Sequence, residues 1–180
     1  MALREVLHFP DKRLREKSEP IERVTEEIRE LARDMLDVMY DEPGIGLAAP
    51  QVGAQVRLIV VDVNWTEEGG ERSPRVLVNP ELVHAEGRIT WNEGCLSVPE
   101  FQADVERAER VRLRAHDLDG NPLVIEASGL EAVCFQHEID HLDGILFIDR
   151  ISRLKRSLYV RKREKQLRQE REAAGPATPV

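Results

Sequence analysis

Apolar residues recur at helical spacing near the start of the chain, from Thr25 onward. These apolar positions are Ile28, Leu31, Ala32, Met35 and Met39. Together they occupy one face of an α-helix. Acidic residues crowd the first turn, where the helix dipole favours them, and Pro43-Gly44 breaks the chain afterwards. The pattern predicts an amphipathic helix packed on the core. An irregular segment over Leu3 to Pro20 precedes it, since its prolines prevent a long helix.

The middle of the chain has the patterns of strands. Val56 to Val63 is mostly apolar, which is typical of a strand buried on both faces. From Arg110 to Ala115 arginine alternates with an apolar residue, so this strand has one face in water. Asp119-Gly120 predicts a hairpin turn that leads into a strand over Leu123 to Ala127. Three shorter strand candidates are Val76 to Val78, Glu81 to Ala85 and Arg88 to Trp91.

Two segments lack a regular pattern. Gly44 to Gln51 is rich in glycine and other small residues, which predicts a loop or an irregular edge segment. Thr66 to Pro74 is a run of Glu and Gly that ends in Ser and Pro, which predicts a solvated loop. Strands outnumber helices and do not alternate with them as βαβ units would, and the chain has no internal repeat. We therefore expect an α+β fold.

Towards the C-terminus the spacing becomes helical again. The apolar positions of this segment are Ile151, Leu154 and Leu158. We expect this stripe to dock the helix on the body of the protein. The last residues, 173–180, predict a disordered tail. The domain is expected to span residues 1–172, including the C-terminal helix.

Length and composition limit the class of protein. With 180 residues, of which 41% are hydrophobic, the chain is long enough for one domain with a continuous core. No stretch approaches the roughly 20 apolar residues of a membrane span, and the first residues lack the apolar run of a secretory signal. Two cysteines are too few for a disulfide framework, which favours a metal or catalytic role for a thiol. We expect a cytoplasmic protein.

Charge is divided unevenly along the chain. The formal net charge is −8, but Arg150 to Arg171 holds ten Lys or Arg and two Glu, so this segment carries +8 and the rest carries −16. An acidic body thus bears a basic helix. Such a helix suits an anionic partner, whereas we expect no binding to a membrane or to DNA.

The strongest chemical signal is the segment Cys134-Phe135-Gln136-His137-Glu138-Ile139-Asp140-His141. It predicts a helix, because Ser128 with Glu131 three residues later forms the pattern of a capping box, and Gly144 suits the end of a helix. The helix places several residues in one arc of its surface: Leu130, Val133, Cys134, His137 and His141. Both histidines therefore lie on the apolar face.

Two histidines one turn apart on one face can bind a single divalent ion. Burying two imidazoles without a shared partner is costly, which favours a metal site over two unrelated core histidines. Glu138 lies beside them, where it can accept a proton from metal-bound water. The His-Glu-x-x-His pattern therefore predicts a metal site.

An open catalytic site needs a third protein ligand. Cys134 lies about 10 Å along the helix axis from His141, so it cannot join both histidines on one ion and is better interpreted as a small buried thiol. Cys95 is the better ligand, because Gly94 before it allows an unusual backbone angle or a close approach. Spacing alone does not exclude an inert core cysteine at position 95.

Three segments together resemble peptide deformylase. They are Gly44-Ile45-Gly46-Leu47-Ala48-Ala49-Pro50-Gln51, Glu93-Gly94-Cys95-Leu96-Ser97 and His137-Glu138-Ile139-Asp140-His141. With Phe9-Pro10-Asp11 near the start and a helical tail, the resemblance extends over nearly the whole domain. It implies a single α+β domain of small antiparallel sheets around a central metal-binding helix. It also implies hydrolytic removal of the N-formyl group from the N-terminal methionine of new polypeptides, which releases formate.

The resemblance implies a role for each catalytic residue. The metal ligands would be Cys95, His137 and His141, holding one Fe(II) ion that zinc, nickel or cobalt can replace. Thiolate and imidazole ligands suit both iron and zinc. Glu138 would take a proton from the metal-bound water and pass it to the leaving amine. The Gln51 side-chain amide and the Leu96 backbone N–H would donate to the oxyanion.

The resemblance also implies how the peptide binds. Backbone groups around Ile45, Gly46 and Gly94 would pair with the main chain of the substrate. The pocket for the methionine side chain would be lined by Ile45, Leu130, Val133 and Cys134. Glu93 and Arg107 match a pair that braces the cysteine loop. The basic C-terminal helix would bind the ribosome, where formylated chains emerge.

Two positions depart from the family pattern, and two other functions compete with deformylation. Pro50 lies at a variable position, and Gln102 stands where many relatives carry an arginine near the substrate. A zinc endopeptidase of the His-Glu-x-x-His type would need a third histidine where Phe147 lies, or a downstream glutamate, for which Glu164 is the only match. A non-catalytic metal-stabilised binding module would need four protein ligands. The count of three ligands favours a metal-dependent hydrolase.

Overall fold

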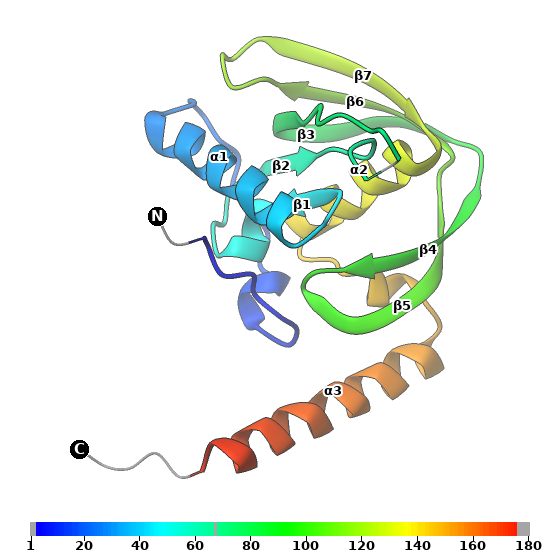
Figure 1. Cartoon of the computed structure of the whole chain (residues 1–180). Helices are drawn as coiled ribbons and strands as arrows, with labels where there is room; N and C mark the ends of the chain where they lie inside the picture. The colour runs from blue at the N-terminus through cyan, green and yellow to red at the C-terminus, as the bar shows by residue number, and fades with distance from the viewer. Residues whose placement is uncertain (1–2, 67, 176–180) are drawn as a thin grey trace.

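An antiparallel sheet of five strands forms the centre of the fold, in the order β1-β2-β3-β6-β7 (Figure 1). Its strands are β1 (Gly46–Ala48), β2 (Leu58–Val61), β3 (Arg75–Glu86), β6 (Arg110–His116) and β7 (Pro122–Ser128). Two further strands, β4 (Ile89–Cys95) and β5 (Val98–Arg107), pair as a separate antiparallel hairpin. The computed structural model describes residues 3–66 and 68–175. The expected α+β fold is confirmed.

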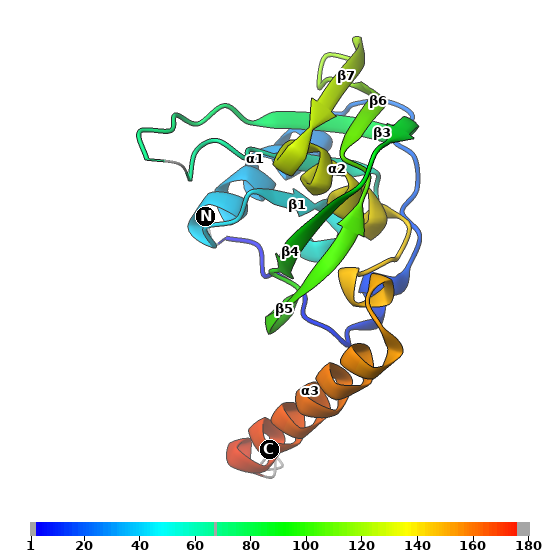
Figure 2. The ribbon, with the colours of Figure 1, turned by 90° about the vertical axis from the view of Figure 1, so that its right-hand side faces the viewer.

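Helices α1 (Glu26–Asp41) and α2 (Gly129–Leu142) pack on opposite faces of the sheet. Strand β2 shows this best, because Leu58 and Val60 lie in the core cluster of α1, whereas Ile59 and Val61 lie in that of α2. All four are at most 1% exposed. Burial on both faces explains the continuous apolar run. Figures 1 and 2 show the β4–β5 hairpin on the other side of α2, so this helix lies at the centre of the molecule.

Helix α1 and strand β6 confirm two patterns in the sequence. The Thr25 side chain caps α1 by accepting a hydrogen bond from the Ile28 N–H at 3.4 Å. The apolar residues of β6 are buried and its arginines are exposed. Arg112 and Arg114 form ion pairs with Glu126 and Glu81 on the neighbouring strands. The hairpin after Asp119-Gly120 is also present.

Three segments differ from the prediction. The candidates Val76 to Val78 and Glu81 to Ala85 belong to one strand, β3, whose register shifts where Pro80 lacks an N–H. The segment Gly44 to Gln51 is more regular than expected, because β1 pairs at the sheet edge and a 3-10 helix (Ala49–Val52) follows. Strand β5 was not predicted, and its buried face ends in a charged residue, Arg107.

The expected docking stripe of the C-terminal helix is wrong for Leu154 and Leu158, although Ile151, just before the helix, packs on the body. Helix α3 (Arg153–Ala174) leaves Leu154 and Leu158 exposed, at 70% and 57%. Its buried residues are Tyr159 and Arg163, at 2% and 8%. Tyr159 packs with aromatic residues of the body, so it sets which face of the helix is covered. Contact with those rings outweighs the burial of two leucines.

The ends of the elements differ slightly from the expected boundaries. Ser128 is the N-cap residue of α2, but its side chain makes no capping hydrogen bond. Helix α3 continues to Ala174, two residues beyond the expected domain boundary at 172. Residues 176–180 of the expected disordered tail lie outside the described part of the chain. Short 3-10 helices cover Lys12–Arg15 and Phe147–Arg150. Among the residues described, no helix has the length and apolar character needed to cross a membrane.

Candidate metal centre

Helix α2 brings His137 and His141 together on its inner face. The two side chains lie one turn apart, with ring centroids separated by 5.0 Å. They are buried, at 9% and 1% exposure. Burial holds the pKa of His141 well below its ordinary value, with a further contribution from positive charge on His137. The His141 imidazole is therefore neutral at physiological pH, which is the form that binds a metal.

Cys95 supplies the third donor from the end of strand β4. Its Sγ lies 3.4 Å from Nε2 of His141. Donor atoms of Cys95, His137 and His141 all lie within 4.8 Å of one another. The register of the β4–β5 hairpin shifts directly after Gly94, which turns Cys95 towards the helix. A thiolate with two imidazoles is a donor set that suits zinc, iron, cobalt and nickel.

Cys134 lies outside this group of donors. Its Sγ contacts the carbonyl oxygen of Ile45 at 3.6 Å. Burial raises the pKa of this thiol well above its usual value, with a smaller contribution from the negative charge of Glu138. A neutral buried thiol is a poor metal ligand. The interpretation of Cys134 as part of an apolar wall fits this position.

A buried ion-pair network holds His137 from behind. Glu93 accepts a hydrogen bond from Nδ1 of His137 at 2.8 Å, which leaves the Nε2 atom for a metal. Arg107 donates two hydrogen bonds to Glu93, each of 2.8 Å, and one to Asp140 at 2.6 Å. Arg150 donates to both oxygens of Asp140. The expected Glu93–Arg107 pair is thus present, and it holds a helix histidine as well as the cysteine strand.

Charges in this network shift the pKa values of its members. Burial by itself raises the pKa of Glu93, but hydrogen bonds from Arg107 and His137 outweigh it and lower that pKa to about 2. Burial by itself lowers the pKa of His137, but contacts with Cys95 and Glu93 outweigh it, so the net change is upward. Glu93 is therefore ionised at all physiological pH values.

Glu138 lies on the flank of the two histidines and is 4% exposed. Burial raises the pKa of its carboxyl group to about 7. Its Oε2 atom has no hydrogen-bond partner among the described residues. The close approach of Gly46 explains the tight packing here, since a Cβ at that position would lie 2.7 Å from Oε1 of Glu138. A carboxyl group with this pKa can both accept and return a proton near neutral pH.

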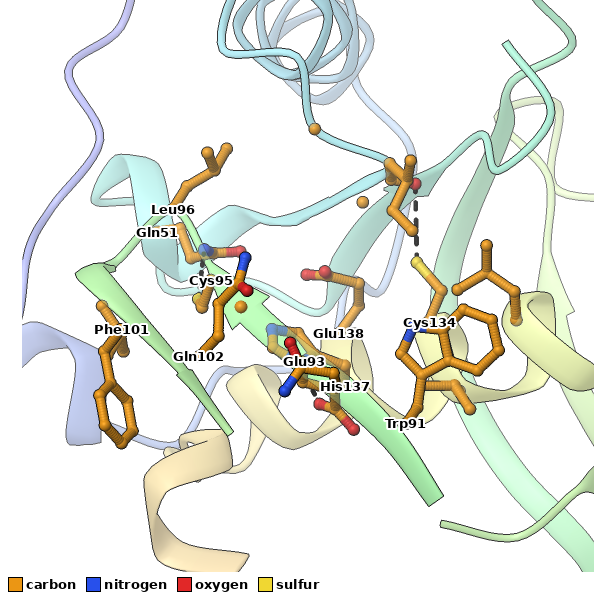
Figure 3. A pocket seen from close by; sticks show the side chains of 18 of the residues that line it. Gln51, Trp91, Glu93, Cys95, Leu96, Phe101, Gln102, Cys134, His137 and Glu138 are labelled. Carbon is orange, nitrogen blue, oxygen red and sulfur yellow. Dashed lines mark hydrogen bonds and ion pairs between the residues drawn. The ribbon is translucent and has the colours of Figure 1, made fainter. Parts of the chain in front are cut away.

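Gln51 is oriented towards the same centre. Its Oε1 accepts a hydrogen bond from the Ala48 N–H at 2.9 Å, so its Nε2 faces Ser97 and Cys95, at 3.1 Å and 3.6 Å. The side chain is 1% exposed. Leu96 follows Cys95 and lines the same pocket. Figure 3 shows Gln51, Cys95, His137 and Glu138 around one hollow.

These residues form the floor of a pocket of about 740 Å³. All predicted substrate-binding residues line it: Ile45, Gly46, Gly94, Leu130, Val133 and Cys134. The lining also includes Trp91 and Phe101, which were not predicted. Trp91 has a signal in the sequence, because residues 91, 93 and 95 point to the same face of a strand. Phe101 has one too, because it alternates with polar residues in step with Ala103 and Val105, but this strand was not recognised.

Gln102 also lines the pocket, opposite Gly94 in the register of the hairpin. It presents an uncharged amide to the pocket. The third ligand of a zinc endopeptidase is absent from the site. The position of its third histidine holds Phe147, whose ring packs 6.1 Å from the His137 ring, and the alternative glutamate, Glu164, is exposed on α3. The described geometry therefore offers three protein donors and an open pocket.

Comparisons with known proteins agree with this geometry. A family model described as polypeptide deformylase matches residues 3–157. A peptide deformylase of Rhodopseudomonas palustris strain BisB5 is 57% identical over 166 residues, 92% of this chain and 95% of that protein. One from Alkalilimnicola ehrlichii is 54% identical over 178 residues, 99% of this chain and 98% of that protein. A crystal structure of a peptide deformylase from Legionella pneumophila has a TM-score of 0.85 and 44% identity, covering 97% of this chain and 100% of that one.

Proposed function

The chain belongs to the peptide deformylase family, and we propose that the Cys95, His137 and His141 centre is its active site. The protein is a metal-dependent hydrolase that removes the N-formyl group from newly made polypeptides. One observation carries the assignment of the site: the three donor atoms lie within 4.8 Å of one another, and two of their residues, Cys95 and His137, line the pocket beside Glu138 and Gln51. Neither a zinc endopeptidase nor a metal-stabilised binding module fits this family membership.

The assignment is tested by measuring formate release from a formyl-methionyl peptide, with metal content determined on the same sample. We expect about one metal per chain, and loss of both metal and activity in Cys95→Ala. Cys134→Ala is the matched control, since this second thiol lies outside the donor group. Equal metal content in Cys95→Ala and the wild-type protein would show that the ligand set is wrong.

We further propose that the metal is one Fe(II) ion, which zinc, nickel or cobalt can replace. The thiolate and imidazole donors fit each of these ions, and the neutral His141 favours binding. A divalent ion here supplies Lewis acidity, which lowers the pKa of water and polarises the formyl carbonyl. Elemental analysis of protein purified without oxygen tests the identity of the ion. Zinc in place of iron in such a sample would contradict the proposal.

In this mechanism Glu138 moves the proton. Its carboxylate takes a proton from the attacking water and delivers it to the leaving amine nitrogen, which the pKa of about 7 permits in both directions. The Gln51 Nε2 and the Leu96 backbone N–H donate to the formyl oxygen as it gains negative charge. A donor of this kind is typically worth roughly 3 kcal/mol. Ser97 and Ala48 hold the Gln51 amide in place for this role.

The same proposal places the peptide in the pocket. Backbone groups of Ile45, Gly46 and Gly94 pair with the main chain of the substrate. The methionine side chain enters the apolar part lined by Leu130, Val133 and Cys134, which Trp91 borders (Figure 3). An aromatic ring suits a thioether, because sulfur and ring edges attract each other. Gln102 provides no charge for the substrate.

Helix α3 supports a proposal that the protein works in the cytoplasm at the ribosome. It presents exposed basic side chains, among them Arg161, Lys162, Lys165 and Arg168. Arg163 is not among them, because it is buried against the body. Charge reversal of the four exposed residues should weaken co-sedimentation with ribosomes, and wild-type binding should weaken steeply as salt rises. Equal co-sedimentation of both proteins at every salt concentration would exclude this role.

A further inference from the structure

Helix α3 touches the body of the protein through one face, which is not its basic face. Tyr159 and Arg163, four residues apart, are buried, while Leu154 and Leu158 are exposed. Figure 1 shows α3 running below β5 and the N-terminal segment. The contacts of this face lead towards the active-site pocket along three separate routes.

The first route is a row of aromatic rings. Tyr159 stacks on Phe101, with ring centroids 4.6 Å apart and planes at 30°. Phe101 in turn stacks on Phe147 at 5.9 Å, and Phe147 lies 6.1 Å from the ring of His137. Phe101 lines the pocket. In Figure 3 it lies at the opposite end of the pocket from Trp91 and Cys134. The ring of Tyr159 therefore supports a wall of the pocket from behind.

The second route holds the backbone at the start of this wall. Glu100 has a φ angle of 57°, a left-handed conformation that is uncommon for a residue with a side chain. Such a conformation persists only where surrounding contacts hold it. One of these contacts comes from α3, since Gln166 Nε2 donates to Glu100 Oε2 at 2.7 Å. Helix α3 thus fixes the residue next to Phe101.

The third route leads to Gln51. Arg163 Nε donates to the carbonyl oxygen of Phe9 at 2.9 Å, and the Phe9 N–H donates to the carbonyl oxygen of Ser97 at 2.7 Å. The hydroxyl oxygen of Ser97 accepts the hydrogen bond from Gln51 Nε2. Contacts of α3 therefore reach both the wall at Phe101 and the amide that faces the metal centre.

We propose that Tyr159, Arg163 and Gln166 are positioning residues for deformylation, through which α3 holds the β5 wall of the pocket in place. The proposal rests on the assignment of this pocket as the substrate site. Phe101 lies at the end away from the methionine pocket, so its wall faces the part of the peptide that follows the methionine. Loosening the wall should weaken binding of that part and raise KM more than it lowers kcat.

The test compares variants on the two faces of the helix. Tyr159→Ala should raise KM for a formylated tetrapeptide by about tenfold, with a smaller rise for formyl-methionine amide. Tyr159→Phe keeps the ring and should behave as wild type, because the Tyr159 hydroxyl has no hydrogen-bond partner among the described residues. Leu158→Ala is the matched control for an adjacent exposed side chain and should also change nothing.

A second pair of variants does not alter the aromatic packing. Gln166→Ala removes the hydrogen bond to Glu100 and should raise the tetrapeptide KM by about threefold. Glu164→Ala, an exposed residue two positions away and therefore on the opposite side of the helix, is its control. If Tyr159→Ala unfolds α3 by circular dichroism, this second pair decides the question. A tetrapeptide KM for Gln166→Ala equal to that of Glu164→Ala would then overturn the proposal.

Other outcomes are equally clear. Tyr159→Ala with the KM and kcat of Leu158→Ala would overturn the positioning role. The proposal would also fail if Tyr159→Ala raised KM equally for both substrates and lost bound metal, because that result would indicate general destabilisation. Failure of the proposed site looks different, since Cys95→Ala would then keep the metal content and formate release of the wild-type protein.

Discussion

Glu93→Gln tests whether the buried ion pair behind His137 stabilises both the fold and the metal centre. The Glu93 side chain is 4% exposed and accepts hydrogen bonds from Arg107 and His137. Its pKa falls from 4.5 to about 2. At about 1.4 kcal/mol per pKa unit, the carboxylate contributes roughly 3 kcal/mol to the free energy of unfolding at pH 7. Removing the charge also leaves the buried Arg107 with Asp140 as its remaining partner.

The pH dependence has a defined sign. Because the folded-state pKa is depressed, the stabilisation is complete above the unfolded pKa of 4.5 and is lost as pH falls through about 2. Urea unfolding of the chelator-treated proteins should show a difference of about 3 kcal/mol between wild type and Glu93→Gln at pH 7, falling to less than half of that at pH 3.

The variant should also bind metal more weakly. A carboxylate that orients a metal-binding histidine typically contributes about ten- to a hundredfold in affinity, so competition with a chromogenic chelator should detect the loss. Glu126→Gln is the control, since its ion pair with Arg112 is exposed. A Glu93→Gln protein as stable as Glu126→Gln, with unchanged zinc affinity, would refute the reasoning.

Three further predictions concern the chemistry of the site. Glu138→Gln should keep about one metal per chain and lose roughly a thousandfold or more in turnover, because it removes the proton acceptor; loss of the metal in this variant would instead make Glu138 a ligand. Iron-loaded protein should lose activity in air, since the Cys95 thiolate and Fe(II) both oxidise, and nickel-loaded protein should keep it; equal decay of the two samples in air would contradict this cause. Gly46→Ala should lower kcat/KM by about a hundredfold while metal content is unchanged. The new Cβ would lie 2.7 Å from Oε1 of Glu138 and 2.8 Å from Sγ of Cys134, so wild-type activity in this variant would mean that both side chains can move away freely.

Local spacing determined much of this protein. The helical period predicted α1. It also put His137 and His141 on one face of α2 with Glu138 beside them, because residues one turn apart on a helix are neighbours whatever surrounds them. Alternation predicted β6 in the same way. The resemblance to a known family added Cys95 and Gln51, whose positions relative to the histidines no local period specifies.

Only the tertiary structure decided which side chains are buried by residues far away in the sequence. The sequence does not show that Arg107 is buried at the end of strand β5, because that position is favourable only when Glu93 and Asp140 surround it. The docking face of α3 was misassigned because Leu154 and Leu158 have the right spacing but no surface to meet, whereas Tyr159 meets Phe101. A periodic pattern shows which side chains share a face. Whether that face is buried depends on partners brought from elsewhere in the chain, and these contacts arise only when the chain folds.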